Sequence, residues 1–139
     1  LGICIDTSFG TINMYKYDNL KLTSYLLCTI IKTPIILLHS GGLRVLEAML
    51  LADHNTNVYL ETSLSLDYYK GSNLINDFVF AYNKIGYDRL LYASDYPYQN
   101  MNDSINTFNT FCLKYKICKH NKKLMQFDNV VKLKTILNS

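Results

Sequence analysis

The stretch that decides the fold is Ile35-Ile36-Leu37-Leu38-His39-Ser40-Gly41-Gly42. A short unbroken apolar run closed by a polar residue is typical of a strand buried on both faces, as in a parallel sheet. The glycines that follow favour a tight turn and close approach of the backbone to a neighbour or ligand. The pattern predicts a buried strand that ends at His39 and turns directly into a helix.

Three further runs of this kind occur along the chain. They are Ile3 to Ile5 before Asp6, Val58 to Leu60 before Glu61, and Leu90 to Ala93 before Ser94 and Asp95. Helical patterns separate and follow them, at about 20–31, 43–52, 74–85, 103–115 and 121–137. Strands that alternate with helices in this way predict βαβ units and a parallel sheet.

Details of the helices can also be predicted. In the helix near 43–52, the apolar residues recur at helical spacing and form one stripe: Leu43, Leu46, Met49 and Leu50. In the helix over 74–85, Leu74, Phe78, Ala81 and Ile85 share a face, and Gly86 supplies a C-terminal stop. Asp103 or Ser104 is expected to cap the helix that follows the last strand.

The size of the chain bears on how the sheet is completed. An open four-stranded parallel sheet would leave unpaired edges beside very apolar strands, whereas a barrel has no edges. A complete (β/α)₈ barrel needs about 250 residues, and the chain has 139, beginning at Leu1. We therefore predict an α/β fold in which residues 1–139 form about half of a TIM barrel.

The residues that close the four runs are Asp6, His39, Glu61 and Asp95. Parallel strands end at a common rim, where barrel enzymes place their active sites. Taken singly, each residue is as easily a loop or cap residue; together they predict a site. We predict His39 and Asp95 as catalytic residues, and Asp95 as a metal ligand able to take a proton from metal-bound water.

The turn after His39 suggests substrate contacts. Gly41 and Gly42 are expected to let a ligand approach the backbone, and Arg44 lies near the start of the next helix, where free N–H groups hold anions. Glu61 is a further predicted substrate-binding residue. The alternative is a plain strand-to-helix turn.

Three segments and the tail resemble a known family. Besides Ile35–Gly42, they are Asn57–Ser63, similar to "NVYxDTS", Asp88–Pro97, similar to "RILFGSDYP", and Phe127–Leu133, similar to "NALRLL". In this order they resemble amidohydrolase-related proteins of the amidohydrolase 2 type, which include aminocarboxymuconate-semialdehyde decarboxylase and related hydrolases. The resemblance implies that residues 1–139 carry strands five to eight of the barrel with their helices, without the N-terminal half. It also implies that His39 is the sixth-strand active-site histidine and that Asp95 is the eighth-strand metal ligand and proton carrier.

The sequence departs from this family in two places. The first-strand His-x-His pair is absent, and the fifth-strand run ends in Asp6 where the family often has a metal-binding histidine. Asp6 is therefore either an oxygen ligand or the mark of a branch with weak or no metal binding; a carboxylate in place of an imidazole changes metal preference. The resemblance implies zinc or manganese in the full-length protein and leaves the metal content of this fragment unknown.

The resemblance implies a metal-dependent hydrolase or a non-oxidative decarboxylase acting on a small molecule, with the fragment alone inactive. Two alternatives remain: a non-catalytic barrel that binds a small ligand, and a freestanding α/β domain for protein interaction. A homodimer is possible, because two half-barrels can complete a ring.

Composition narrows the partners and the compartment. The net charge of +3, with lysines gathered near the end, is too mild for a nucleic-acid surface, and no apolar run reaches the roughly 20 residues that cross a membrane. The four cysteines form no CxxC pair, and Cys112, Cys118 and His120 lack zinc-site spacing. With Cys4 and Cys28 expected to be buried thiols, the pattern suits a reducing cytoplasm.

Overall fold

The computed structural model describes residues 2–8 and 16–138. Its centre is a parallel sheet in the order β1-β2-β3-β4. The strands are β1 (Ile3–Asp6), β2 (Ile35–Leu38), β3 (Val58–Glu61) and β4 (Leu90–Leu91). All four predicted strands are confirmed. The last is shorter than predicted, because the N–H of Tyr92 donates to the carbonyl of Met125 (2.9 Å) and leaves the ladder.

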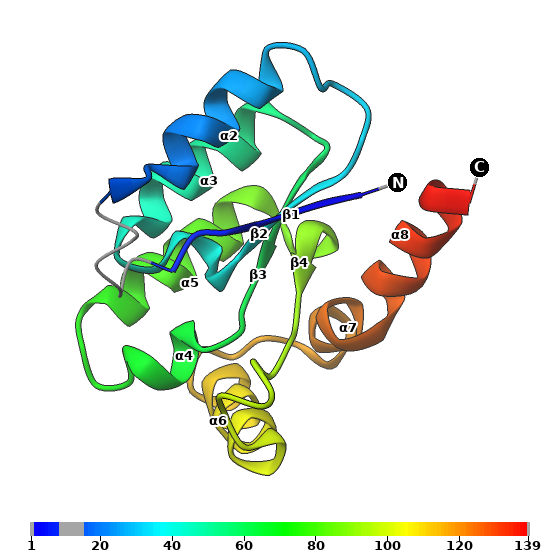
Figure 1. Ribbon diagram of the computed structural model, residues 1–139. Helices are drawn as coiled ribbons and strands as arrows, with labels where there is room; N and C mark the ends of the chain where they lie inside the picture. Colours follow the sequence, from blue (N-terminus) through cyan, green and yellow to red (C-terminus); the bar gives the residue numbers. More distant parts are fainter. Residues whose placement is uncertain (1, 9–15, 139) are drawn as a thin grey trace.

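Helices follow the strands as predicted (Figure 1). They are α2 (Asn19–Leu27), α3 (Val45–His54), α4 (Ser65–Tyr68), α5 (Leu74–Ile85), α6 (Met101–Lys114), α7 (Lys119–Lys123) and α8 (Asn129–Asn138). Short 3-10 segments span His39–Arg44 and Tyr87–Arg89, and a π-helical turn, Leu124–Asp128, joins α7 to α8. The α5 bounds and the Gly86 stop (φ 85°) match the prediction.

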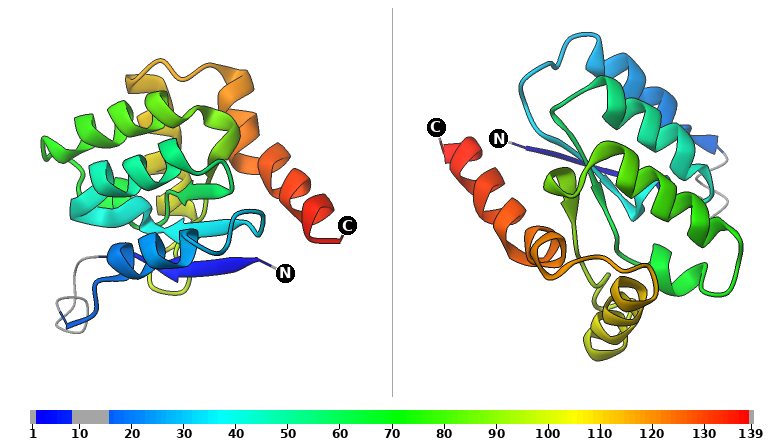
Figure 2. Two further views of the ribbon diagram at one scale, coloured as in Figure 1. Left: turned by 90° about the horizontal axis from the view of Figure 1, so that it is seen from above. Right: turned by 180° about the vertical axis from the view of Figure 1, so that it is seen from behind.

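The main core lies between the sheet and α2, α3 and α5, which cover one face of it (Figures 1 and 2). Alternate strand residues point to that face, because side chains alternate along a strand. They are all buried: Ile5, Ile35, Leu37, Val58, Leu60 and Leu90. This layer fixes the strands, and with them the rim at their carboxyl ends.

The opposite face of the sheet is covered differently. Tyr59 and Leu91 pack against Leu133 of α8 in a small separate cluster. Near the end of α8, a methyl group on Gly2 would lie 3.4 Å from Leu137 Cδ2, so the helix reaches the start of β1. Figure 2 shows the two ends of the chain close together in both views. Helix α8 therefore lies at the amino ends of the strands, away from the rim.

The predicted apolar stripe of the helix at 43–52 is wrong in direction. Leu43, Leu46 and Leu50 are 54%, 41% and 51% exposed, while the buried face carries Val45, Ala48, Met49 and Ala52. The turn before α3 sets the rotation of the helix, and the small alanines let it pack closely against its neighbours. Helix orientation here follows steric fit rather than the number of leucines.

Other local predictions also need correction. Helix α2 stops at Leu27, and α6 starts at Met101 with Asn100 as its cap, whose side chain accepts from the N–H groups of Asn102 and Asp103. The segment predicted as one helix over 121–137 is helical throughout, and a π-helical turn within it separates α7 from α8.

The prediction that Cys4 and Cys28 are buried thiols was wrong. Cys4 and Cys28 are exposed, and Cys112 is buried. Cys4 points to the face of β1 opposite the core, and Cys28 lies just past the end of α2. Within the described residues, no helix is long and apolar enough to cross a membrane.

Candidate active site at the carboxyl end of the sheet

The rim brings Asp6, His39 and Glu61 together. Asp6 and Glu61 close strands on either side of β2, and His39 follows β2 directly. The backbone N–H of His39 donates to Glu61 Oε2 at 3.3 Å, and His39 Nε2 lies 3.6 Å from Asp6 Oδ1. Three of the residues predicted from separate strand ends therefore meet at one place.

The turn that carries His39 has an unusual backbone. His39, Ser40 and Gly41 have φ values of 63°, 51° and 85°, in the left-handed region that costs a non-glycine residue about 1–2 kcal/mol. Hydrogen bonds hold this conformation: Ser65 Oγ donates to the carbonyl of His39 (2.6 Å), and Ser40 Oγ donates to the carbonyl of Glu61 (2.7 Å). Strain of this kind gathers at functional sites when the surroundings enforce it.

The environment of the His39 ring fixes which nitrogen carries the proton. Nδ1 lies 3.0 Å from the carbonyl oxygen of Ser63 and 3.0 Å from Ser63 Oγ. A carbonyl oxygen only accepts hydrogen bonds, so Nδ1 must be the donor. In the neutral ring the lone pair is then on Nε2, the nitrogen that faces Asp6. The ring is about 90% buried, whereas the Asp6 side chain is 56% exposed.

Glu61 is buried behind the histidine, with 4% of its surface exposed. Its carboxylate accepts from Ser63 Oγ (2.6 Å) and from the Ser63 N–H (2.5 Å) as well as from His39. Burial raises the pKa of Glu61 above its ordinary value, and these hydrogen bonds oppose the rise only in part. Glu61 thus contacts the histidine and its turn, while its predicted contact with substrate stays a prediction.

The structure gives Gly41 a packing role. A Cβ on Gly41 would lie 2.7 Å from Ala48 Cβ, and its N–H donates to Thr7 Oγ1 at 2.8 Å. Glycine is therefore required here by α3, and this N–H is already used. Gly42 continues the turn with φ 52° and ψ −124°.

Arg44 is engaged by carboxylates on the protein itself. Its guanidinium pairs with Asp18 at 2.9 Å, and it also forms a hydrogen-bonded ion pair with Glu47. These contacts raise the pKa of Arg44 and lower those of both carboxyls. A substrate anion at Arg44 would have to compete with both partners.

Asp95 lies four residues beyond β4, in a loop, with φ 64°. Its carbonyl accepts from the Gln99 N–H (3.1 Å), but its carboxylate has no hydrogen-bond or ion-pair partner among the described residues. In the described part of the chain, no three histidine, cysteine, aspartate or glutamate residues are grouped to hold a metal ion. The roles of Asp95 and Asp6 as metal ligands stay predictions.

Sequence reasoning missed the hydroxyl residues that build the site. Ser63, Ser65 and Ser40 all hydrogen-bond to the His39 or Glu61 region, and Tyr82 Oη lies 3.1 Å from Ser40 Oγ. Ser63 stands two residues after Glu61, a spacing at which a side chain commonly bonds nearby backbone or side-chain groups. That spacing could have predicted the role of Ser63. No local pattern could have predicted the role of Tyr82, because it lies in α5, 42 residues after Ser40.

Comparison with known proteins identifies the family and the fold of the chain. The family described as "Amidohydrolase" matches residues 16–121. An uncharacterized TIM-barrel protein from Bordetella bronchiseptica matches over 100% of this chain and 47% of its own, with 18% identity and a TM-score of 0.78. No curated protein sequence matches the chain.

Two decarboxylase structures are also similar in fold. One is a dihydroxybenzoic acid decarboxylase from a Polaromonas species with bound manganese and the inhibitor 2-nitroresorcinol (23% identity, TM-score 0.60, 86% of this chain and 39% of that one). The other is 2,6-dihydroxybenzoate decarboxylase from Rhizobium (20% identity, TM-score 0.59, 84% and 39%). The chain spans less than half the length of these proteins, and its sheet is the fold of part of a TIM barrel.

Proposed function

The chain belongs to the amidohydrolase family, and on that premise we propose that it forms the carboxyl-terminal half, strands five to eight, of a metal-dependent hydrolase or non-oxidative decarboxylase acting on a small molecule. The observation that carries the proposal is the His39 ring, which is held by Ser63 so that Nε2 faces Asp6 at the mouth of the sheet.

The Asp6–His39 pair has a spacing suited to a divalent ion. Ligands bound at about 2.0–2.2 Å in tetrahedral geometry lie about 3.4 Å apart, and Asp6 Oδ1 lies 3.6 Å from His39 Nε2. A metal-binding histidine usually donates its other N–H to a carbonyl or carboxylate, as Nδ1 donates to Ser63. Zinc or manganese would thus be held by Asp6 and His39, with Asp95 and residues outside this chain as further ligands.

The bound ion would polarise a substrate carbonyl or carboxylate and lower the pKa of bound water. Asp95, whose carboxylate has no hydrogen-bond or ion-pair partner among the described residues, would also receive the proton released in that step. Ser63 and Glu61 would hold the histidine, and the strained turn would keep the ring facing the mouth.

Metal titration tests this proposal. With the full-length protein, calorimetry with Mn²⁺ and Zn²⁺ is expected to show binding that weakens at least about tenfold in Asp6→Asn and in His39→Gln. Glu47→Gln, whose partner is Arg44, is the matched control and should bind metal normally. Release of CO₂, against release of a hydrolysed leaving group, then distinguishes decarboxylation from hydrolysis.

A second candidate is a non-catalytic barrel that binds a small ligand. It is favoured by Asp6, which stands where the family often has a metal-binding histidine. A full-length protein that binds no metal and gains no activity with zinc or manganese would support it.

Three further proposals concern the compartment, the binding partners and the assembly of the protein. We place the protein in the cytoplasm, because all four cysteines are free and thiols persist in reducing compartments. We propose that it acts on a small molecule and binds neither nucleic acids nor membranes. A homodimer that joins two sheets is the alternative to a barrel completed by an N-terminal half.

A further inference from the structure

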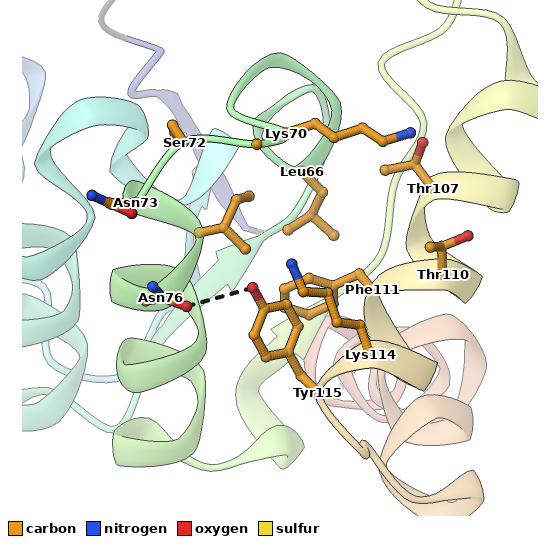
Figure 3. Close-up of a pocket in the computed structure, with 12 residues that line it drawn as sticks. Leu66, Lys70, Ser72, Asn73, Asn76, Thr107, Thr110, Phe111, Lys114 and Tyr115 are labelled. Atoms are coloured by element: carbon orange, nitrogen blue, oxygen red, sulfur yellow. Dashed lines mark hydrogen bonds between the residues drawn. The ribbon is translucent and has the colours of Figure 1, made fainter.

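A hollow lies between α6 and the segment that runs from α4 to the start of α5 (Figure 3). Its volume is about 490 Å³, within the range of roughly 300–1,000 Å³ typical of small-molecule pockets. None of Asp6, His39, Glu61 and Asp95 lines it. We propose that this pocket binds a small organic carboxylate with a flat apolar body, at a site separate from the proposed active site.

The floor of the pocket is apolar and preformed. Leu66, Ile75 and Phe111 come from α4, α5 and α6, and each is at most 7% exposed. The Phe111 ring is held between Tyr82 (6.2 Å between ring centroids) and Tyr115 (5.0 Å). Because these side chains are already packed, an apolar ligand would bury surface here with little reordering of the protein.

One wall is fixed by a bond between two helices. The hydroxyl of Tyr115 donates to Asn76 Oδ1 at 3.5 Å, as the dashed line in Figure 3 shows. On the opposite side the pocket is open, since a Cβ on Gly71 would meet no atom within 4 Å. The pocket therefore has an apolar base and an aromatic side, and it is uncrowded at Gly71.

The edge of the pocket carries positive charge. Lys70 and Lys114 line it, and among the described residues no aspartate or glutamate does. Neither lysine is in an ion pair with a described carboxylate; the paired lysines of that part of the chain are Lys84 and Lys123. Figure 3 shows the Lys70 ammonium group above Leu66, and the Lys114 ammonium group beside Phe111 and Tyr115, 5.2 Å from the centroid of the Tyr115 ring.

The two lysines and the apolar floor of the pocket together indicate the class of ligand. A bare phosphate would gain nothing from the apolar floor, and a neutral aromatic would gain nothing from Lys70 and Lys114. A carboxylate on an apolar ring uses both, with the ring on Phe111 and the carboxylate in the positive field of the two lysines. Every lining residue comes from 66–76 or 107–115, so the inference does not depend on the metal site.

Binding of 1-naphthoate, followed by amide chemical shifts in the full-length protein, tests the inference. We expect saturable shifts at Thr107, Thr110 and Phe111, with weaker binding of 1-naphthalenemethanol and none of inorganic phosphate. The double variant Lys70→Gln/Lys114→Gln should bind 1-naphthoate about fivefold to tenfold more weakly, the loss expected for two exposed charge contacts. Thr110→Trp, which fills the pocket, should abolish these shifts.

The matched control is Lys132→Gln/Lys134→Gln, which removes two exposed lysines from α8 and should leave binding unchanged. Shifts confined to residues near His39, or phosphate binding as tight as that of naphthoate, would overturn the inference. Equal affinity for the neutral alcohol would overturn it as well. Because the shifts report place and not turnover, a failed metal titration would leave this result unaffected.

Discussion

The two sides of the rim are built differently. Beside β2 and β3, His39, Glu61 and Ser63 are buried and bonded to one another. Beside β4, whose ladder spans only Leu90–Leu91, Asp95 sits in a loop with its carboxylate unbonded among the described residues. The comparison shows that residues of this chain alone fix the orientation of the His39 ring. The Asp95 carboxylate, in contrast, has no bond to the described residues that would fix its position.

The largest expected effect is on the open side. We expect Asp95→Asn in the full-length protein to lower kcat/KM by about a thousandfold or more, since it removes a proton carrier and a proposed metal ligand. The thermal midpoint of the metal-free protein should stay within about 2 °C, because a carboxylate without partners among the described residues contributes about 0.5 kcal/mol or less. Near-normal activity would show that Asp95 is not part of the active site, which would then consist of the residues beside β2 and β3.

On the closed side, Gly41→Ala should damage folding instead. The new methyl group would meet Ala48 Cβ at 2.7 Å, at φ 85°, so we expect a loss of about 2–4 kcal/mol in the free energy of unfolding. Gly71→Ala is a matched control with the same φ and no atom within 4 Å, and should lose only about 1 kcal/mol. Equal losses in denaturant titrations would show that steric contact with α3 is unimportant.

Glu61→Gln should also destabilise the closed side. The amide cannot accept both Ser63 bonds as the carboxylate does, so we expect a loss of about 1–3 kcal/mol, with a smaller fall in activity than for Asp95→Asn. Chemical denaturation measures the first and steady-state kinetics the second. A fall in activity as large as for Asp95→Asn would assign Glu61 a direct role in the reaction.

The smallest effect concerns pH. Burial raises the pKa of Glu61 in the folded protein, so the folded state binds more protons than the unfolded chain between the ordinary and the raised pKa. The contribution of Glu61 to stability is therefore complete below the ordinary pKa, and it is lost as pH rises through the raised one. The stability difference between wild type and Glu61→Gln, plotted against pH, should show this decline; a rise would mean that the hydrogen bonds outweigh burial.

Much of the fold was readable from local patterns. Each strand showed as an apolar run closed by a polar residue, the pattern of strands buried on both faces. In the described residues the face opposite the core is buried at Tyr59 and Leu91, whereas Cys4 on β1 is exposed. The bounds of α5 followed from apolar spacing and Gly86. The outward leucines of α3 were misread, since the kinked turn before the helix, and not its composition, sets its rotation.

The sequence alone determined the order of elements, the shared rim and the residue types that close each strand, because these depend on neighbours within a few positions. Only the tertiary structure decided that His39 Nδ1 meets Ser63, that Glu61 lies buried behind it, and that Arg44 is held by Asp18 and Glu47. Those contacts join residues up to 26 positions apart. They depend on strand register and on a left-handed turn, which no local periodicity encodes.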